Sequence, residues 1–261
     1  MNLDLSGKNA MVCGSTQGIG FASACALSEL GANVTLVARN EEKLKEAISK
    51  LPKHGNHQYL VADFNYPDKL EEVLKSHLTD TGMAYSILVN NTGGPAGGLA
   101  IDADIDQFRR AFNQHLICNQ LLTTALVPGM KSEGYGRIIN VISTSVKIPL
   151  SGLGVSNTIR GAVANWSKTL ANELGQYNIT VNNVLPGATS TARLSSIVEN
   201  KAIKTGDSTE NVLQAMANQV PMKRVGKPEE VANAIAFLAS PAANYINGVN
   251  LPVDGGRTGS L

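Results

Sequence analysis

The sequence predicts an α/β fold, a doubly wound sheet of about seven parallel strands with helices on both faces. Short runs rich in valine, isoleucine and leucine alternate with longer segments of helical periodicity along most of the chain. The runs are continuously apolar, as in MVC, VTLV and IINVI, which is typical of strands buried on both faces. With 261 residues, 43% of them hydrophobic, the length favours a single domain over residues 1–261.

The predicted elements follow one another along the chain. The candidate strands are Asn9–Cys13, Asn33–Val37, Gln58–Ala62, Ser86–Val89, Arg137–Ile142, Thr180–Val184 and Val249–Val253. The candidate helices are Ile19–Leu30, Glu41–Leu51, Asp68–His77, Asp104–Lys131, Asn157–Gln176 and Pro228–Ala239. Pro228, followed by two glutamates, is typical of a helix start, because proline suits the first turn and the acids face the positive end of the helix dipole.

Residues 188–227 interrupt this alternation with a polar stretch that contains Gly206 and Asp207. A short helix is predicted within it at Thr209–Asn218. An insertion after a late strand of such a sheet overhangs the edge where ligands bind, so we expect a mobile substrate lid. A surface excursion without a binding role is the alternative.

Composition excludes several classes of function. The 22 basic and 21 acidic residues are interspersed and the net charge is +1, so we expect neither nucleic acid nor a membrane surface as a partner. No run reaches the ~18 apolar residues of a spanning helix, and the first residues lack the apolar core of a signal peptide. Cys13, Cys25 and Cys118 lack metal-ligand spacing and lie in apolar runs, so we expect no metal site and a reduced, cytoplasmic compartment. The expected partner is a small molecule.

A glycine-rich loop joins the first candidate strand to the first candidate helix. Its residues are Gly14, Ser15, Thr16, Gln17, Gly18, Ile19 and Gly20. Glycines permit a tight turn and let backbone N–H groups approach a pyrophosphate, which then lies at the positive end of the helix dipole. The spacing is G-x-x-x-G-x-G rather than the commoner G-x-G-x-x-G, and a plain glycine turn is the alternative. We expect a Rossmann-type domain that binds a nicotinamide dinucleotide at the carboxyl ends of its strands.

The second strand ends where the adenosine ribose of such a ligand should lie. Ala38 and Arg39 stand at this point. An acidic residue there would accept hydrogen bonds from the ribose 2′-hydroxyl, whereas an arginine beside a small residue suits a 2′-phosphate. This favours NADP(H) over NAD(H), and a solvated surface charge is the alternative role for Arg39.

Two further strand ends carry candidate binding residues. Asp63, followed by Phe64, ends the third strand and could accept a hydrogen bond from the adenine amino group or cap the following helix. Asn91, Thr92 and Gly93 follow the fourth strand, where amides can brace neighbouring strands and glycine lets a ligand pass close to the backbone. Both groups are expected along the same crevice.

Further motifs complete a pattern that spans nearly the whole chain. They are Ser143 after the fifth strand, Pro186-Gly187 with Thr191, Gly226-Lys227-Pro228-Glu229-Glu230-Val231-Ala232 and Val253-Asp254-Gly255-Gly256. With the glycine loop, Asp63 and Asn90–Gly93, these residues resemble the short-chain dehydrogenase/reductase family, particularly its 3-oxoacyl-(acyl carrier protein) reductase-like members. The resemblance implies an oxidoreductase and places Pro186, Gly187 and Thr191 at the nicotinamide end of the site.

The chain departs from this family at most of its catalytic positions. The family's tyrosine and lysine, spaced Y-x-x-x-K, correspond to Ser156 and Arg160, and its catalytic asparagine corresponds to His115, whereas Ser143 is kept. A serine hydroxyl is a far weaker acid than a phenol, so Ser156 cannot inherit the proton-transfer role. Arg160 could still hold the ribose hydroxyls of the nicotinamide, although it cannot release a proton near neutral pH.

The proton source and the function therefore stay open at the level of sequence. His115 or Lys147 could be the catalytic acid, the alternatives being a core histidine and a surface lysine. An NADP(H)-dependent oxidoreductase acting on a carbonyl or secondary alcohol, with Ser143 holding the oxygen, is one hypothesis. A catalytically inactive dinucleotide-binding protein, a sensor or oligomer partner, is the second. A non-redox lyase or isomerase on the same scaffold is a third, for which no specific residue speaks. Apolar residues on several faces of the two longest helices predict a homo-oligomer, and the resemblance implies a tetramer.

Overall fold

The computed structural model describes residues 1–52 and 55–260. Within this part of the chain, seven parallel strands form one sheet in the order β3-β2-β1-β4-β5-β6-β7. The strands are β1 (Asn9–Cys13), β2 (Asn33–Ala38), β3 (Gln58–Val61), β4 (Ile87–Asn90), β5 (Gly136–Val141), β6 (Ile179–Pro186) and β7 (Asn250–Val253). This is the Rossmann strand order extended by one strand, so the predicted fold class is confirmed.

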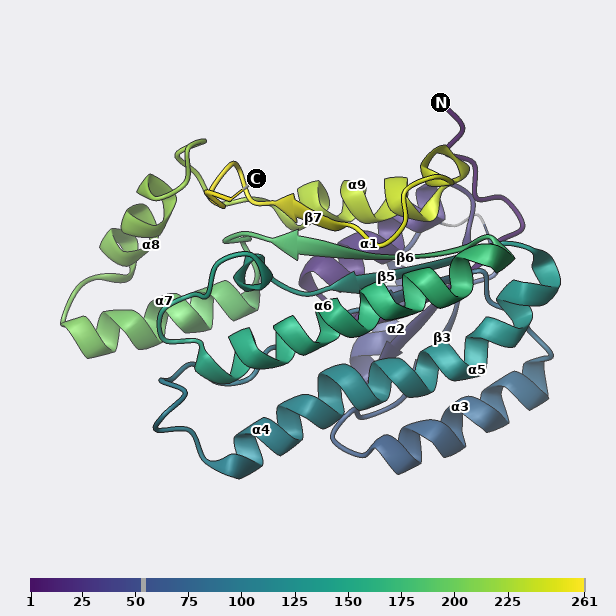
Figure 1. Cartoon of the computed structure of the whole chain (residues 1–261), viewed down its shortest axis with the longest axis horizontal. Coiled ribbons are helices and arrows are strands. Elements are labelled where there is room, and N and C mark those ends of the chain that lie inside the picture. Colours follow the sequence, from purple (N-terminus) through teal and green to yellow (C-terminus); the bar gives the residue numbers. More distant parts are fainter. Residues whose placement is uncertain (53–54, 261) are drawn as a thin grey trace.

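Helices cover both faces of the sheet (Figure 1). They are α1 (Gly18–Glu29), α2 (Glu41–Ser49), α3 (Pro67–Thr81), α4 (Ile105–Phe112), α5 (Cys118–Glu133), α6 (Gly154–Leu174), α7 (Ala192–Thr205), α8 (Thr209–Asn218) and α9 (Pro228–Ala239). Helices α1, α2 and α9 pack against one face, and α3, α5 and α6 pack against the other. The sheet is therefore buried between two helical layers, as its continuously apolar strands require.

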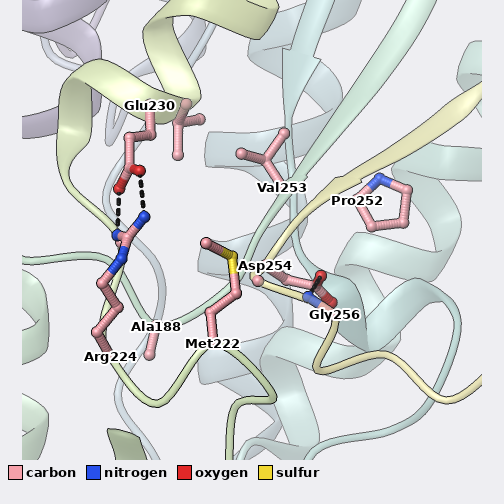
Figure 2. A pocket seen from close by; sticks show the side chains of 11 residues that line it. Ala188, Met222, Arg224, Glu230, Pro252, Val253, Asp254 and Gly256 are labelled. Atoms are coloured by element: carbon pink, nitrogen blue, oxygen red, sulfur yellow. Dashed lines mark hydrogen bonds and ion pairs between the residues drawn. The ribbon is translucent and has the colours of Figure 1, made fainter.

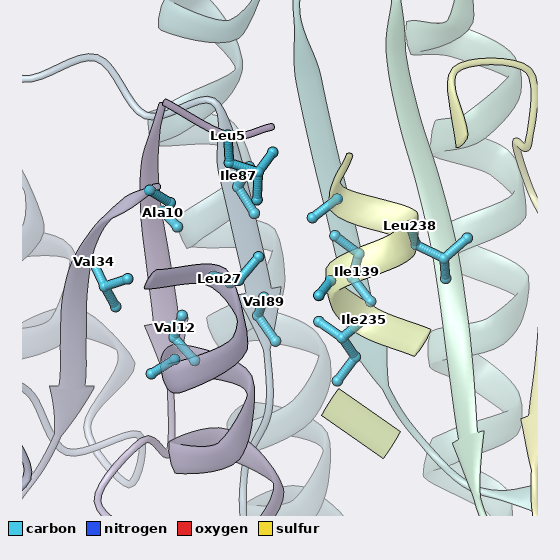
Figure 3. Close-up of a cluster of buried hydrophobic side chains, with 14 of the residues drawn as sticks. Leu5, Ala10, Val12, Leu27, Val34, Ile87, Val89, Ile139, Ile235 and Leu238 are labelled. Atoms are coloured by element: carbon cyan, nitrogen blue, oxygen red, sulfur yellow. The ribbon is translucent and has the colours of Figure 1, made fainter. Parts of the chain in front are cut away.

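Alternate residues of a central strand pack against the two helical layers. Ala10 and Val12 of β1 belong to the cluster under α1 and α9, whereas Met11 and Cys13 belong to the cluster on the opposite face. Figure 3 shows the first cluster, in which Leu27 of α1 lies among the strand side chains. Because strand side chains alternate in direction, a strand covered by helices on both faces is mostly apolar along its whole length.

The long helix predicted at Asp104–Lys131 is interrupted, and that prediction was wrong in this respect. A π-helical segment, Asn113–Ile117, separates α4 from α5. A π-turn inserts an extra residue into the helical ladder and shifts the direction of the side chains that follow. The segment places His115 in the interior, where its imidazole meets Thr92 after β4.

Residues 188–227 leave the sheet after β6 and return to the same place. The backbone N–H of Ser190 donates to the carbonyl of Gly226 at 2.8 Å, and the N–H of Gly226 donates to the carbonyl of Ala188 at 2.8 Å. Helix α8 has the predicted bounds, whereas α7 was not predicted. The two helices share a small apolar cluster and extend beyond the carboxyl ends of the strands (Figure 1). We name this segment, residues 188–227, the α7–α8 excursion.

Candidate functional site

The candidate site lies where the strand order reverses between β1 and β4. Chains that leave two such neighbouring strands turn to opposite faces of the sheet, which opens a crevice at their carboxyl ends. The loop Gly14–Gly20 follows β1, and the loop that begins at Asn91 follows β4. The structure therefore brings together two loops that the sequence analysis assigned to one crevice.

The glycine loop is held closed by contacts that leave no room for side chains. Gly14 and Gly18 both have φ of +57°, a left-handed conformation that glycine adopts without strain. An ideal Cβ on Gly20 would lie 2.2 Å from the carbonyl oxygen of Gly14. The amide of Asn91 donates to the carbonyls of Cys13 and Gly14 at 3.2 Å each, which fixes the loop to the end of β4. The predicted bracing role of the amides after β4 is confirmed.

The amino end of α1 is left open for an anion. Its N-cap residue, Gln17, makes no capping hydrogen bond through its side chain, and the first turn holds no acidic residue. The first backbone N–H groups of a helix have no partner within the helix and carry part of its positive dipole. A close-packed glycine turn before an uncapped helix fits the pyrophosphate of a dinucleotide.

The residues predicted near the adenosine occupy the ends of β1, β2 and β3. Ser15 is buried, and its Oγ accepts a hydrogen bond from the N–H of Val37 at 3.0 Å, which ties the glycine loop to β2. Thr16 is half-buried beside it. Arg39 is exposed and has neither a hydrogen bond nor an ion pair in the described part of the chain. Its charge is thus available to a ligand. The side chain of Ile19 packs against the cluster under α1.

Asp63 and Phe64 follow β3. The Oδ1 of Asp63 accepts from the backbone N–H of Asn65 at 3.0 Å and from its amide at 2.7 Å. The N-cap position of α3 belongs to Tyr66, so the alternative helix-capping role of Asp63 was wrong. The ring of Phe64 packs against the core cluster under α3 and α5. Contact with a ligand would therefore come from the Asp63 carboxylate rather than from the Phe64 ring.

At the other end of the crevice, His115 is enclosed by protein. It is 2% exposed, and its Nδ1 lies 2.6 Å from the hydroxyl of Thr92. Its Nε2 has no hydrogen-bond partner among the described residues. Burial and then the positive charge of Arg160 hold the pKa of His115 well below its ordinary value. The imidazole is therefore neutral at physiological pH.

Arg160 reaches the same region from α6. It is 7% exposed, and its Nη1 donates to the carbonyl of Val141 at 3.1 Å, at the end of β5. Burial and then the charge of Arg193 lower the pKa of Arg160 to about 10, so the guanidinium stays protonated at neutral pH. A buried and permanent positive charge thus stands at the position of the family's lysine.

The other predicted catalytic residues have distinct placements. Ser143 is half-buried after β5, and its Oγ accepts from the N–H of Ser145 at 3.1 Å. Ser156 lies in the first turn of α6, which begins at Gly154, earlier than predicted. A Cβ on Gly154 would lie 2.4 Å from the backbone nitrogen of Ala100, so this turn packs directly on the loop after β4. Lys147 is exposed at the end of a short 3₁₀ turn.

The α7–α8 excursion contacts the glycine loop at the carboxyl ends of the strands. Thr191 caps α7, where its Oγ1 accepts from the N–H of Leu194 at 3.3 Å. A Cβ on Gly18 would lie 3.2 Å from Cγ2 of Thr191, so the excursion touches the glycine loop. Pro186 is the last residue of β6, and Gly187 donates to the carbonyl of Val253 at 2.9 Å. These contacts join both ends of the predicted dinucleotide crevice.

One residue near the site was missed by sequence reasoning. Arg193 lies in the first turn of α7 at the exposed rim, and its Nη2 donates to the carbonyl of Pro95 at 2.5 Å. Gly94 lies beside the same guanidinium. The available signal was the apolar spacing of Leu194, Val198 and Ala202, which predicts a helix that begins after Thr191 and includes Arg193 in its first turn.

A separate pocket lies at the base of the excursion (Figure 2). Residues of the two late motifs, including Glu230 and Asp254, line it. The guanidinium of Arg224 donates to both carboxylate oxygens of Glu230, at 2.7 and 2.6 Å, and Glu230 also accepts from the N–H of Lys227 at 2.7 Å. This part of the family motif has a structural role at the start of α9.

No group of histidine, cysteine, aspartate or glutamate in residues 1–52 and 55–260 could hold a metal ion. No helix in the same ranges is long and apolar enough to cross a membrane.

Comparison with known proteins decides the family. The family model described as enoyl-(acyl carrier protein) reductase matches residues 14–258. The chain belongs to the short-chain dehydrogenase/reductase family. It is 33% identical to the 3-oxoacyl-[acyl-carrier-protein] reductase FabG of Vibrio cholerae, over 97% of this chain and 98% of that one. It is 31% identical to the NADPH-dependent reductase BacG of Bacillus subtilis, over 98% of this chain and 100% of that one.

Solved structures of short-chain dehydrogenases agree with this assignment. The L-sorbose reductase of Gluconobacter frateurii, in complex with NADPH and L-sorbose, superposes with a TM-score of 0.93 at 32% identity, and all of both chains is covered. The resemblance predicted from the motifs is therefore confirmed at the level of the family.

Proposed function

We propose that this short-chain dehydrogenase is an NADP(H)-dependent, 3-oxoacyl reductase-like oxidoreductase that acts on a carbonyl or a secondary alcohol. The observation that carries the proposal is the glycine loop, closed by Gly20 against Gly14 and followed by the uncapped α1 at the reversal of strand order. Arg39, exposed and unpaired among the described residues, supports the phosphorylated cofactor over NAD(H). NADPH in the similar L-sorbose reductase supports the same choice.

The chain's own residues bind and orient the reactants. A bound nicotinamide dinucleotide supplies hydride-transfer chemistry. Asn91, Thr92, Gly93, Pro186, Gly187 and Thr191 line the path toward the nicotinamide, and Asp63 lies at the adenine end. Arg160 holds the ribose hydroxyls with guanidinium donors that Val141 leaves free. Ser143 holds the substrate oxygen.

The proton follows an unusual route in this proposal. Arg160 cannot release a proton near neutral pH, and Ser156 has no acidic phenol. His115 is neutral because of its lowered pKa and is enclosed by protein, so it does not act as an imidazolium acid; its Nε2, unpaired among the described residues, holds a water molecule instead. Water supplies the proton to the substrate oxygen, and the hydroxide that remains is reprotonated by exchange with solvent. Lys147, exposed beyond Ser143, is the less favoured source.

A second function, dinucleotide binding without turnover, is favoured by one observation. Arg160 is buried and hydrogen-bonded to the Val141 carbonyl, so the usual lysine-assisted relay has no counterpart at that position. Absorbance of the reduced nicotinamide, followed with a panel of ketones, 3-oxoacyl thioesters and alcohols, separates the two functions. Turnover of any of these substrates supports the oxidoreductase. Tight NADPH binding without turnover across the panel supports the sensor or oligomer partner.

The cofactor assignment is tested by Arg39→Ala, with the exposed Arg110→Ala as the matched control. We expect Arg39→Ala to weaken NADPH binding at least about tenfold and to leave NADH binding unchanged, because only NADPH carries the 2′-phosphate. Titration of the protein's effect on NADPH and NADH fluorescence measures both. Equal loss for the two cofactors would contradict the assignment.

The relay itself is tested by restoring the family residues. The double variant Ser156→Tyr with Arg160→Lys should gain reduction of a 3-oxoacyl thioester, because it regains an acidic phenol beside an ammonium group. A gain in turnover at unchanged NADPH affinity would show that the native chain lacks only the proton-transfer step of the family reaction. No gain would show that the surrounding pocket has also changed.

We further propose that residues 1–261 act as one unit, with the α7–α8 excursion as the substrate lid, in a cytoplasmic homotetramer. Phe112 and Ile105 of α4 are 40% and 61% exposed, and such apolar surface supports an interface with other copies. Light scattering of the purified protein measures the oligomer. A monomer at micromolar concentration would contradict the tetramer.

A further inference from the structure

Two guanidinium groups, one from α6 and one from α7, lie close to Gly94. An ideal Cβ on Gly94 would lie 3.7 Å from Nη2 of Arg193 and 3.9 Å from Nη2 of Arg160. The two nitrogens are therefore no further apart than the sum of these distances. Arg160 reaches this point from α6 in the interior, and Arg193 reaches it from the exposed first turn of α7.

Neither arginine has an acidic partner. Arg160 donates to the carbonyl of Val141 and Arg193 donates to the carbonyl of Pro95, and no carboxylate pairs with either in residues 1–52 and 55–260. Each guanidinium keeps further N–H donors that no described residue satisfies. His115, the other titratable group beside Arg160, is neutral and offers no negative charge.

Leaving a buried charge without a counter-ion is costly. Two like charges near one another add to this cost, and the lowered pKa of Arg160 reflects both burial and the charge of Arg193. An arrangement of this kind is retained at a site where an anion binds, because a bound anion removes both penalties at once. Parallel N–H donors of arginine match the geometry of a carboxylate.

We propose that Arg160 and Arg193 bind a carboxylate group of the substrate, over the space that Gly94 leaves empty. A carboxylate that accepts one hydrogen bond of ordinary length from each guanidinium spans a distance comparable to their separation. This inference rests on the proposed oxidoreductase function and deepens it, since it names the substrate class as carbonyl or hydroxy compounds that carry a carboxylate. Arg193 belongs to the α7–α8 excursion, so the proposed carboxylate would also contact the excursion.

Gly94 gives this proposal a sharp test. Its φ lies outside the left-handed range, and an added Cβ would meet only ordinary van der Waals contacts, so Gly94→Ala is compatible with the backbone. The new methyl group would occupy the space between the two guanidinium groups and leave both charges in place. Gly98→Ala is the matched control, because Gly98 lies in the same loop and a Cβ there meets nothing within 4 Å.

The binding experiment uses malonate as an unreactive dicarboxylate and malonamide as its neutral counterpart. Each is titrated by calorimetry into the full-length protein at constant ionic strength, with and without saturating NADPH. We expect malonate to bind and malonamide not to bind. Gly94→Ala and Arg193→Gln should weaken malonate at least about tenfold, since hydrogen bonds to charged groups are strong. Gly98→Ala and Lys201→Gln, the latter removing a charge from the same helix, should not.

Three binding outcomes would overturn the proposal. If malonate binds no better than malonamide, or binds equally to Gly94→Ala and Gly98→Ala, the arginine pair is not a carboxylate site. If Arg193→Gln weakens NADPH itself at least about tenfold while malonate is unaffected, the pair binds a cofactor phosphate instead.

A turnover experiment separates this proposal from the proposed function. It compares the reduction of 4-oxopentanoate with that of its methyl ester. Preference for the acid, lost in Arg193→Gln, supports the inference. Equal rates for acid and ester overturn the inference and leave the oxidoreductase standing. Malonate binding that depends on Arg193 and Gly94, without turnover of any carbonyl compound, supports the carboxylate site and contradicts the proposed oxidoreductase function.

Discussion

Gly20→Ala tests whether the glycine loop is closed as described. The added Cβ would lie 2.2 Å from the Gly14 carbonyl oxygen and 2.7 Å from the amide nitrogen of Asn91. Both atoms are held, the first by the backbone and the second by its hydrogen bonds to Cys13 and Gly14. Alanine gains about 1 kcal/mol over glycine from helix preference. Overpacking costs about 1–3 kcal/mol, and each hydrogen bond lost from Asn91 costs about 1 kcal/mol more.

The clash therefore outweighs the gain in helix preference, and we expect a net loss of about 1–4 kcal/mol in the free energy of unfolding. Gly161→Ala is the matched control, because Gly161 lies within α6 and its added Cβ meets nothing within 4 Å. It should gain up to about 1 kcal/mol.

Urea unfolding followed by circular dichroism measures both variants, and NADPH fluorescence measures binding. The loop displaced in Gly20→Ala should also weaken NADPH at least about tenfold. If Gly20→Ala is as stable as the native chain and binds NADPH equally well, the closed loop does not exist in solution and the reasoning fails.

Three further outcomes are expected. Leu27→Ala, at a fully buried position under α9 (Figure 3), should cost about 2–5 kcal/mol in urea unfolding, and a cost below about 1 kcal/mol would contradict the packing described. The hydrogen bond from Arg224 lowers the pKa of Glu230 from 4.5 to about 2, so its contribution to stability is present above pH 4.5 and is lost as the pH falls toward 2. Glu230→Gln should therefore show a smaller drop in urea midpoint between pH 6 and pH 3 than the native chain, and equal drops would refute the pairing. Burial, with the charge of Asp63, raises the pKa of Cys118 to about 12, so iodoacetamide should label it at least about tenfold more slowly in the native protein than in urea at pH 8. Peptide mass spectrometry reads the two rates, and equal rates would show that the thiol is accessible.

The sheet could be predicted closely because burial on both faces leaves a plain mark in sequence. Each run such as VTLV or IINVI coincides with a strand to within a residue or two. The glycine spacing after β1 likewise predicted a tight turn, and in the structure other atoms occupy the space that a Cβ on Gly14 or Gly20 would need. These features depend on neighbours in sequence and on the general rule that parallel strands are covered by helices.

The missed features depend on contacts between distant segments. The π-helical segment at Asn113–Ile117 has no propensity signature, and what accompanies it is the contact of His115 with Thr92. Helix α7 did leave an apolar period at Leu194, Val198 and Ala202, which the surrounding polar residues obscured. Arg193 approaches Arg160 only because α7 packs over the ends of the strands, and the spacing of residues along the sequence does not predict that packing.

The hydrogen bonds that join the two ends of the α7–α8 excursion have a consequence for how substrate choice can vary among related proteins. Ala188, Ser190 and Gly226 join the two ends by backbone hydrogen bonds, and the helices between them carry their own apolar cluster. Because its two ends are hydrogen-bonded to each other, the sequence and length of this segment can change without altering the register of β6 or the start of α9. Exchange of residues 192–225 between relatives, which keeps Thr191 against the glycine loop, should therefore transfer the choice of substrate while the glycine loop and its cofactor stay as they are.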